Sequence, residues 1–155
     1  MTRAMNASEI VEVSELLRES YALLGELENL SPAQIAFLMS ARASPETVAR
    51  ESQHEKYVIA CDGGSITGVV SVSDGRITKL YVRPDVARRG IGSELYMVAE
   101  SMIAAAGHHS VSLVAFPGAV AFYEKMGLRA VGQKEATGPL KGLTVTLMEK
   151  HFGVA

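Results

Sequence analysis

Apolar residues in the first third of the chain recur every three or four positions, which is the spacing of one face of an α-helix. The pattern runs from Asn6 to about Leu27 and predicts a helix there. Asn6 followed by Glu9 matches a capping box, in which each side chain bonds the backbone N–H of the other residue. The apolar positions that share this face are Ile10, Val13, Leu17 and Leu24.

Two shorter helices are predicted from the residues that would start them. Residues 31–34 read Ser-Pro-Ala-Gln, which supplies an N-cap, a first-turn proline and the glutamine of a capping box. This helix continues through residues 35–39, and Ser-Pro-Glu at residues 44–46 gives similar signals for a third helix. The segment from Gly25 to Leu30 is expected to form the loop between the first two helices.

From Lys56 onward the pattern changes to that of strands. Three runs rich in β-branched residues, Tyr57–Cys61, Ile66–Val72 and Arg76–Val82, are separated by the turns Asp-Gly-Gly and Ser-Asp-Gly. Strands joined by such short turns run antiparallel, because a parallel pair needs a crossover of about a dozen residues or more. These three strands are therefore expected to form a meander.

The rest of the chain alternates helices and strands. A helical stripe from Ile91 ends near Gly107, and the apolar run Val111–Phe116 follows it, which predicts a parallel strand reached by a right-handed crossover. A short helix from Ala119 to Met126 then ends at Gly127. Two closing strands are predicted at Leu128–Val131 and Leu143–Lys150. Together these elements predict an α/β fold with a mixed sheet, in a single domain that spans residues 1–155.

Composition and charge exclude several classes of function for this chain. The chain has 155 residues, 48% hydrophobic and 21% charged, and a formal net charge of −2, so it lacks the basic field that attracts nucleic acid or anionic membrane. Its one cysteine, Cys61, allows no intramolecular disulfide and no cysteine-based metal site. We therefore expect a cytoplasmic protein with no metal, no nucleic-acid partner and no membrane partner.

A glycine turn carries the candidate chemistry. After the strand that ends at Val82, a loop leads to Arg88-Arg89-Gly90-Ile91-Gly92-Ser93 at the start of a helix. The free N–H groups and positive dipole of a helix N-terminus favour an anion, and glycines let it approach the backbone. No lysine occupies the Walker position, and the bulky Leu95 does not fit a dinucleotide fingerprint. A diphosphate is the expected occupant.

A second motif follows about thirty residues later, Ala-x-x-Phe-Tyr-Glu-Lys-x-Gly-Leu from Ala119 to Leu128. Together with the glycine turn and the order of elements, it resembles the GNAT superfamily of N-acetyltransferases, and the likeness spans about Tyr57 to Lys150. The resemblance implies a mixed, mostly antiparallel sheet flanked by helices and splayed open between the fourth and fifth family strands. It also implies acetyl-CoA as cosubstrate, with an acetyl group transferred to a primary amine by direct attack on the thioester.

The same resemblance implies roles for particular residues. Main-chain groups of Leu80, Tyr81 and Val82 would pair with the pantetheine arm of acetyl-CoA. Tyr123 would sit beside the sulfur, where a phenol that is protonated at neutral pH can act as general acid. The diphosphate would be held by the N–H groups of Arg88, Arg89, Gly90, Ile91, Gly92 and Ser93.

The chain departs from the family pattern at several positions. Ala87 stands where relatives usually carry Gln or Arg, and Gly118 stands near the place of a common asparagine. The strand before the glycine turn has no carboxylate to serve as general base, so a water chain, a glutamate such as Glu26 or Glu28, or a histidine is needed instead. The missing base leaves open a second reading, a domain that binds acyl-CoA without turnover. A third is a phosphate-binding module of unrelated fold.

The first family strand is expected to be very short or absent, because only residues 2–5 precede the first helix. An uncovered sheet edge would favour a homodimer. The acceptor, a small-molecule or peptide amine, is not encoded in a recognisable motif.

Overall fold

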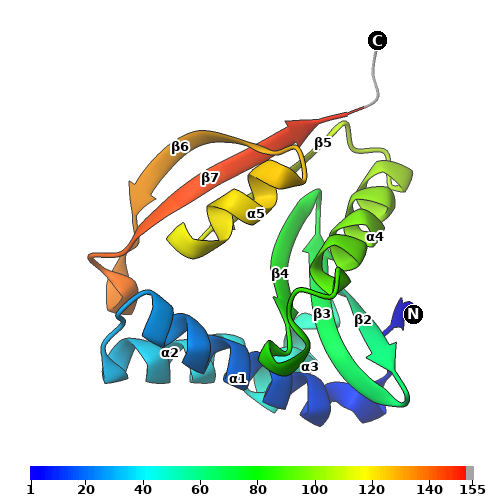
Figure 1. The fold of residues 1–155 in the computed structure, drawn as a ribbon, viewed down its shortest axis with the longest axis horizontal. Helices are drawn as coiled ribbons and strands as arrows, with labels where there is room; N and C mark the ends of the chain where they lie inside the picture. The colour runs from blue at the N-terminus through cyan, green and yellow to red at the C-terminus, as the bar shows by residue number, and fades with distance from the viewer. Residues whose placement is uncertain (153–155) are drawn as a thin grey trace.

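The computed structural model describes residues 1–152 and contains one seven-stranded sheet flanked by helices (Figure 1). The strands lie in the order β1-β2-β3-β4-β5-β7-β6, and neighbours are antiparallel except for the parallel pair β4–β5. This confirms the predicted mixed, mostly antiparallel α/β sheet. The strands are β1 (Thr2–Ala4), β2 (Lys56–Asp62), β3 (Ser65–Ser73), β4 (Arg76–Val82), β5 (Ser110–Ala115), β6 (Arg129–Glu135) and β7 (Thr144–His151).

Helices cover both faces of the sheet, and each face has its own core. One core lies under α4 and α5 and includes Leu95, Tyr96 and Met148. The other lies under α1, α2 and α3 and includes Leu17 and Tyr21. The helices are α1 (Ile10–Leu27), α2 (Pro32–Arg42), α3 (Pro45–Glu51), α4 (Ile91–Ala105) and α5 (Val120–Lys125), with short 3-10 turns η1 (Ala7–Glu9), η2 (Pro84–Val86), η3 (Pro117–Ala119) and η4 (Gly138–Leu140).

The predicted capping boxes are present where the sequence placed them. Ser31 Oγ accepts the N–H of Gln34 at 3.2 Å, and Gln34 Oε1 accepts the N–H of Ser31 at 2.9 Å. Asn6 and Glu9 form the same reciprocal pair before the first helix. These caps satisfy backbone donors that the first turn of a helix leaves free.

The predicted loop from Gly25 to Leu30 is partly wrong, because α1 continues to Leu27. Gly25 lies inside the helix, where a Cβ would come within 2.5 Å of Ile35 Cδ1. This glycine therefore allows α1 and α2 to pack closely and does not end the helix.

The two edges of the sheet are β1, which is very short as the sequence predicts, and β6, which is longer than predicted. The first strand is present but only three residues long, and it covers the edge of β2 through the pair Arg3 and Ile59. The strand β6 runs on to Glu135, beyond the predicted end at Val131. It passes a register shift beside Gly132 and then presents charged side chains, as exposed edge strands commonly do. Association into a homodimer stays a prediction.

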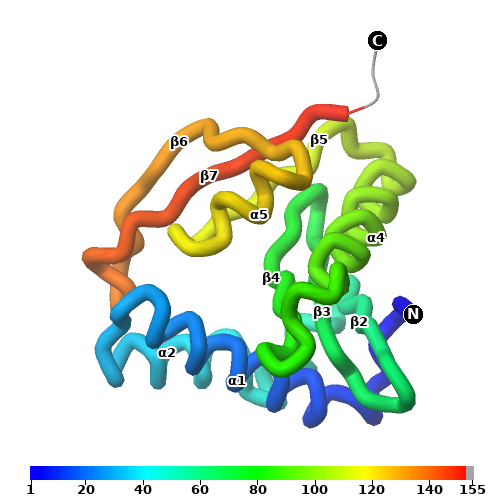
Figure 2. Tube along the Cα trace, viewed as in Figure 1, coloured from blue at the N-terminus to red at the C-terminus, as the bar shows by residue number. Residues whose placement is uncertain are grey.

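The sheet opens between β4 and β5, as the predicted splay requires. The two strands are in register only at Arg76 and Ser112, where Ser112 N–H bonds the carbonyl of Gly75 at 3.2 Å. Further along β4, the carbonyl of Thr78 accepts a 2.9 Å bond from Arg42 Nη2 of α2 instead of pairing with β5. The halves meet again where η4 reaches α2 (Figure 2), with Leu140 packed against the second core.

Candidate functional site

A cleft of about 620 Å³ lies where the end of α1, the end of β4, the start of α4 and α5 come together. Every predicted site residue except Arg89 lines it. The predicted residues in the lining are Leu80, Tyr81, Val82, Arg88, Gly90, Ile91, Gly92, Ser93 and Tyr123. Residues that are distant in sequence therefore form one continuous surface.

The glycine turn presents unbonded amides at one end of the cleft. The first hydrogen bond of α4 runs from Glu94 N–H to the carbonyl of Gly90 at 3.0 Å. No acceptor among residues 1–152 takes the N–H groups of residues 90–93. Gly90 has φ of 80°, a left-handed conformation that suits glycine. Four successive donors at a helix N-terminus are well placed to bind an anion.

Arginine adds positive charge beside these amides. Arg88 is exposed, lines the cleft and has φ of 69°, which is uncommon for a residue with a side chain. Within the part of the chain that the structure describes, no carboxylate lies within ion-pair distance of Arg88 or Arg89. Arg88 is therefore free to meet an anionic ligand, while Arg89 lies outside the lining.

The register of β4 decides which main-chain groups face the opening. Arg83 N–H bonds the carbonyl of Thr67 in β3 at 2.8 Å, and residues alternate along a strand. Tyr81 consequently turns its main-chain groups toward β3, where it pairs with Val69. Leu80 and Val82 turn theirs toward the gap between β4 and β5. Tyr81 thus contributes its side chain to the cleft, and its neighbours contribute backbone donors and acceptors.

Tyr123 stands where the cleft meets the gap. It is 8% exposed, and its ring packs at 5.1 Å from that of Phe122 and at 6.5 Å from that of Tyr96. Its hydroxyl has no hydrogen-bond partner in residues 1–152 but is not sealed from the cavity. Burial raises the pKa of this phenol well above its usual value of 10. Tyr123 therefore keeps its proton at neutral pH and can donate it to a ligand.

Sequence reasoning missed several residues of the lining, because they approach only through the tertiary fold. The end of α1 supplies Leu24, Leu27 and Glu28, and the C-terminal half supplies Phe122 and Lys125. The sequence offers Glu28 as a possible general base. Its Oε2 instead accepts the N–H of Gly118 at 2.7 Å and so connects α1 to η3. No local pattern in the sequence signals a contact between residues ninety positions apart.

The histidines lie away from this site. His108 is 4.0 Å from Asp74, His151 is 3.0 Å from Glu149, and none of the four histidines lines the cleft or the gap. Among the described residues Glu28 is the one carboxylate in these linings. No group of three or more possible metal ligands occurs within residues 1–152.

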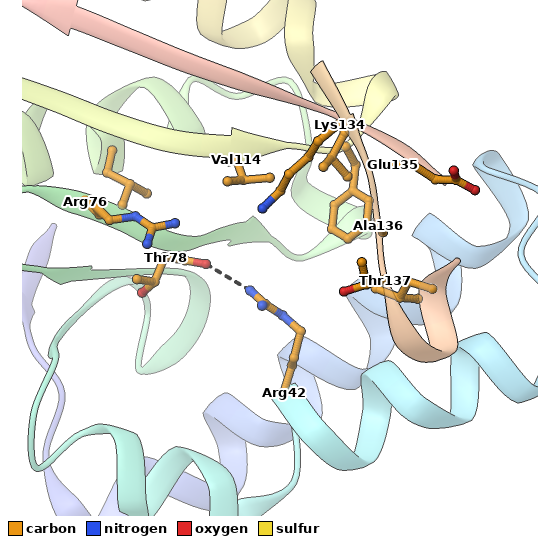
Figure 3. A pocket seen from close by; sticks show the side chains of 12 residues that line it. Arg42, Arg76, Thr78, Val114, Lys134, Glu135, Ala136 and Thr137 are labelled. Carbon is orange, nitrogen blue, oxygen red and sulfur yellow. Dashed lines mark hydrogen bonds between the residues drawn. The ribbon is translucent and has the colours of Figure 1, made fainter. Parts of the chain in front are cut away.

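A second cavity of about 350 Å³ opens on the other side of the gap, and we call it the basic pocket. The gap between β4 and β5 holds a small cavity of about 70 Å³ lined by residues of both strands. This cavity shares Tyr81 and Tyr123 with the cleft, and it shares Thr78 and Val114 with the basic pocket. The cleft, the gap and the basic pocket therefore lie next to one another along the opened sheet, and Figure 3 shows the basic pocket. The basic pocket is defined by Arg42, Arg76, Ile77, Val114, Phe116 and Lys134, together with residues of the β6–η4 turn.

The geometry agrees with comparisons to known proteins. Residues 26–152 match the acetyltransferase (GNAT) domain. A GCN5-related N-acetyltransferase from Rhodopseudomonas palustris superposes with a TM-score of 0.89 at 23% identity, over 98% of this chain and 95% of that chain. The PaiA N-acetyltransferase of Thermoplasma acidophilum, solved in complex with coenzyme A, gives 0.79 at 18% identity over 98% of each chain.

A phosphinothricin acetyltransferase from Sinorhizobium meliloti, solved with acetyl-CoA, gives a TM-score of 0.74 at 22% identity over 99% of this chain and 88% of that chain. At these identities the solved structures establish the fold. A search of curated protein sequences finds no match. None of the helices in residues 1–152 has both the length and the apolar character needed to cross a bilayer.

Proposed function

Because the chain belongs to the GNAT acetyltransferase domain family, we propose that it transfers an acetyl group from acetyl-CoA to a primary amine. One observation carries the proposal. A single cleft has unbonded helix amides at one end and an unpartnered, buried phenol at the other. A ligand with a diphosphate at one end and a reactive thioester at the other suits both the amides and the phenol.

The residues of the cleft fit acetyl-CoA along its length. The N–H groups of residues 90–93, with Arg88, suit the diphosphate. Leu80 and Val82 offer main-chain groups to the amides of the pantetheine arm, as an added strand would. When bound, acetyl-CoA supplies an acyl group already activated as a thioester.

Within this scheme the protein positions the reactants and manages protons. The acceptor nitrogen, once deprotonated to the neutral amine, forms a bond to the acetyl carbon and loses a second proton to water, while the carbon–sulfur bond breaks and its electron pair leaves on sulfur. Tyr123 donates its hydroxyl hydrogen toward that sulfur, which stabilises the developing thiolate. Burial raises the pKa of Tyr123, so the phenol keeps its proton until negative charge develops on the sulfur. Water takes the proton of the acceptor ammonium in this scheme, because none of the described residues that line the gap is a carboxylate or a histidine.

A second candidate is a domain that binds acyl-CoA without turnover. The observation in its favour is that the lining of the gap, within the described residues, holds neither a carboxylate nor a histidine to act as base. The two candidates share the cleft and differ only in whether free coenzyme A is released.

Two measurements test the proposal. Acetyl-CoA should raise the unfolding temperature, because a ligand specific for the native state stabilises it. Release of free thiol should then depend on an added amine. Gly92→Glu places bulk and negative charge in the lining and should abolish the shift, while Gly92→Gln, of similar size but neutral, should retain part of it. Equal shifts in both variants would place the diphosphate elsewhere, and a shift without thiol release from any amine would favour the binding domain.

A further inference from the structure

The basic pocket has an unusual balance of charge for a cavity of its size. Figure 3 shows the charged ends of Arg42, Arg76 and Lys134 turned toward the same space beside Val114. The carboxylate of Glu135 belongs to the same lining but points away from this space. Three cations from α2, β4 and β6 therefore face one cavity.

None of these three cations forms an ion pair with a carboxylate of the described residues. Across residues 1–152, no carboxylate lies within 4.0 Å of Arg42, Arg76 or Lys134. Like charges held together repel one another, and this arrangement is favourable only when an anion or solvent compensates them. The pocket is thus electrostatically prepared for a negatively charged group.

The three cations differ in how firmly their side chains are held: Arg42 is fixed by hydrogen bonds, whereas Arg76 and Lys134 are not. Arg42 Nε bonds the hydroxyl of Tyr21 at 2.7 Å, and its Nη2 bonds the carbonyl of Thr78 at 2.9 Å. Arg42 is consequently held in place, with further N–H donors left over. Arg76 and Lys134 are exposed, and their side chains make no hydrogen bond to another described residue, so they can close on a ligand.

Part of the wall of the basic pocket is apolar, and Ile77, Val114 and Phe116 in it also line the gap. Leu140 and Val145 complete this apolar part of the wall. An acceptor that reached from the cations to the gap would lay an apolar body along it and present its amine toward Tyr123.

We propose that the acceptor is a small primary amine that also carries a carboxylate, with Arg76 and Lys134 binding the carboxylate in the basic pocket. The inference rests on the proposed acetyl transfer and adds the class of substrate to it. A planar carboxylate matches the paired N–H groups of a guanidinium. By the same charges, polycationic acceptors such as polyamines are disfavoured.

The test uses acceptors that share one body and differ only in the carboxylate. Leucine, leucinamide and 3-methylbutylamine form one set, and 6-aminohexanoate with hexylamine forms a second in which carboxylate and amine are far apart. We expect the carboxylate member of at least one set to have a kcat/KM roughly tenfold or more above its matched amine. Spermidine should be a poor acceptor.

Variants then connect the preference to the pocket. Arg76→Gln and Lys134→Gln together should reduce kcat/KM for the preferred carboxylate acceptor by roughly tenfold to 100-fold, with little change for the matched amine. Arg129→Gln is the control, because Arg129 lies on the same strand as Lys134, pairs with Glu149 and is outside the pocket.

Binding gives a readout that does not depend on turnover. Calorimetric titration with the carboxylate probes should show binding that the Arg76 and Lys134 substitutions weaken and Arg129→Gln does not. If matched amines are used equally well and the double variant changes nothing, the inference is overturned while acetyl transfer stands. If no amine is acetylated, the proposed function fails, and the titration still decides whether the pocket binds carboxylates.

Discussion

At the scale of single residues, the position of Tyr123 leads to a direct prediction. Tyr123→Phe should lower kcat by about 100-fold, because it removes the donor to sulfur, and should leave the Kd of acetyl-CoA nearly unchanged. Tyr96→Phe is the matched control, since its hydroxyl bonds Glu100 at 2.8 Å and lies outside the cleft lining. Steady-state kinetics and a binding titration separate the two effects. Equal kcat in both variants would remove Tyr123 from the acid role.

The ion pair between Lys79 and Glu51 predicts an asymmetry in stability. Their side chains are 2% and 25% exposed, with Nζ and Oε1 at 2.5 Å. Glu51→Gln leaves a buried, uncompensated ammonium and should cost about 3 kcal/mol of unfolding free energy. Lys79→Met should cost less, because the remaining carboxylate is partly solvated and still bonded by Tyr57 at 3.0 Å. Denaturant titration measures both, and a reversed order would contradict this account.

Residue roles could be predicted from the sequence where the backbone carries them. The glycines at residues 90 and 92 signal a turn whose amides are free, and that signal is local. The orientation of Tyr81 depends on pairing with β3, which the sequence does not specify residue by residue. Glu28 and the three cations of the basic pocket come from separate elements, so only the fold brings them to the site.

At the scale of elements, Gly68 in β3 fixes how closely α4 approaches the sheet. A Cβ there would lie 2.7 Å from Leu95 Cδ1, 3.1 Å from Ile91 Cγ2 and 3.2 Å from the carbonyl oxygen of Tyr81. Gly68→Ala should therefore destabilise the fold by about 1–3 kcal/mol through overpacking. It should also weaken acetyl-CoA binding, because Ile91 is in the first turn of α4.

The control for this prediction is Gly132→Ala in β6. The nearest atom to a Cβ at that position is Leu147 Cδ1 at 3.7 Å, which is an ordinary contact. Thermal unfolding of the two variants should differ clearly. A destabilised Gly132→Ala beside a neutral Gly68→Ala would show that the spacing of α4 is not set by Gly68.

The first residue of a helix could be predicted from the sequence where a capping residue precedes it. Helix starts follow from Ser31 and Ser44, whose hydroxyls accept the N–H of the residue three positions on. The end of α1 was predicted too early because a glycine can either end a helix or allow close packing inside one. Only the contact of Gly25 with Ile35 shows that it allows close packing. The length of β6 was underestimated because an edge strand lacks the apolar alternation that marks a half-buried strand.

At the scale of the whole molecule, the opened sheet predicts a pattern of amide exchange. In the free protein the N–H groups of Leu80 and Val82 face the gap, while that of Tyr81 faces β3. Acetyl-CoA should slow hydrogen exchange at Leu80 and Val82 by at least tenfold and affect Tyr81 much less. Residue-resolved exchange by NMR measures this directly. Uniform protection of all three amides would mean general stabilisation and not pairing along β4.

The cleft lies at the start of α4 and the basic pocket lies beside the β6–η4 turn, and the gap between β4 and β5 shares lining residues with both. If acetyl-CoA binds in the cleft and the acceptor binds in the basic pocket, as proposed, the two molecules do not compete for one binding site. Neither must then dissociate before the other binds. The proposed function therefore predicts a ternary complex, in which the acetyl group passes directly from acetyl-CoA to the acceptor without a covalent acyl-enzyme intermediate.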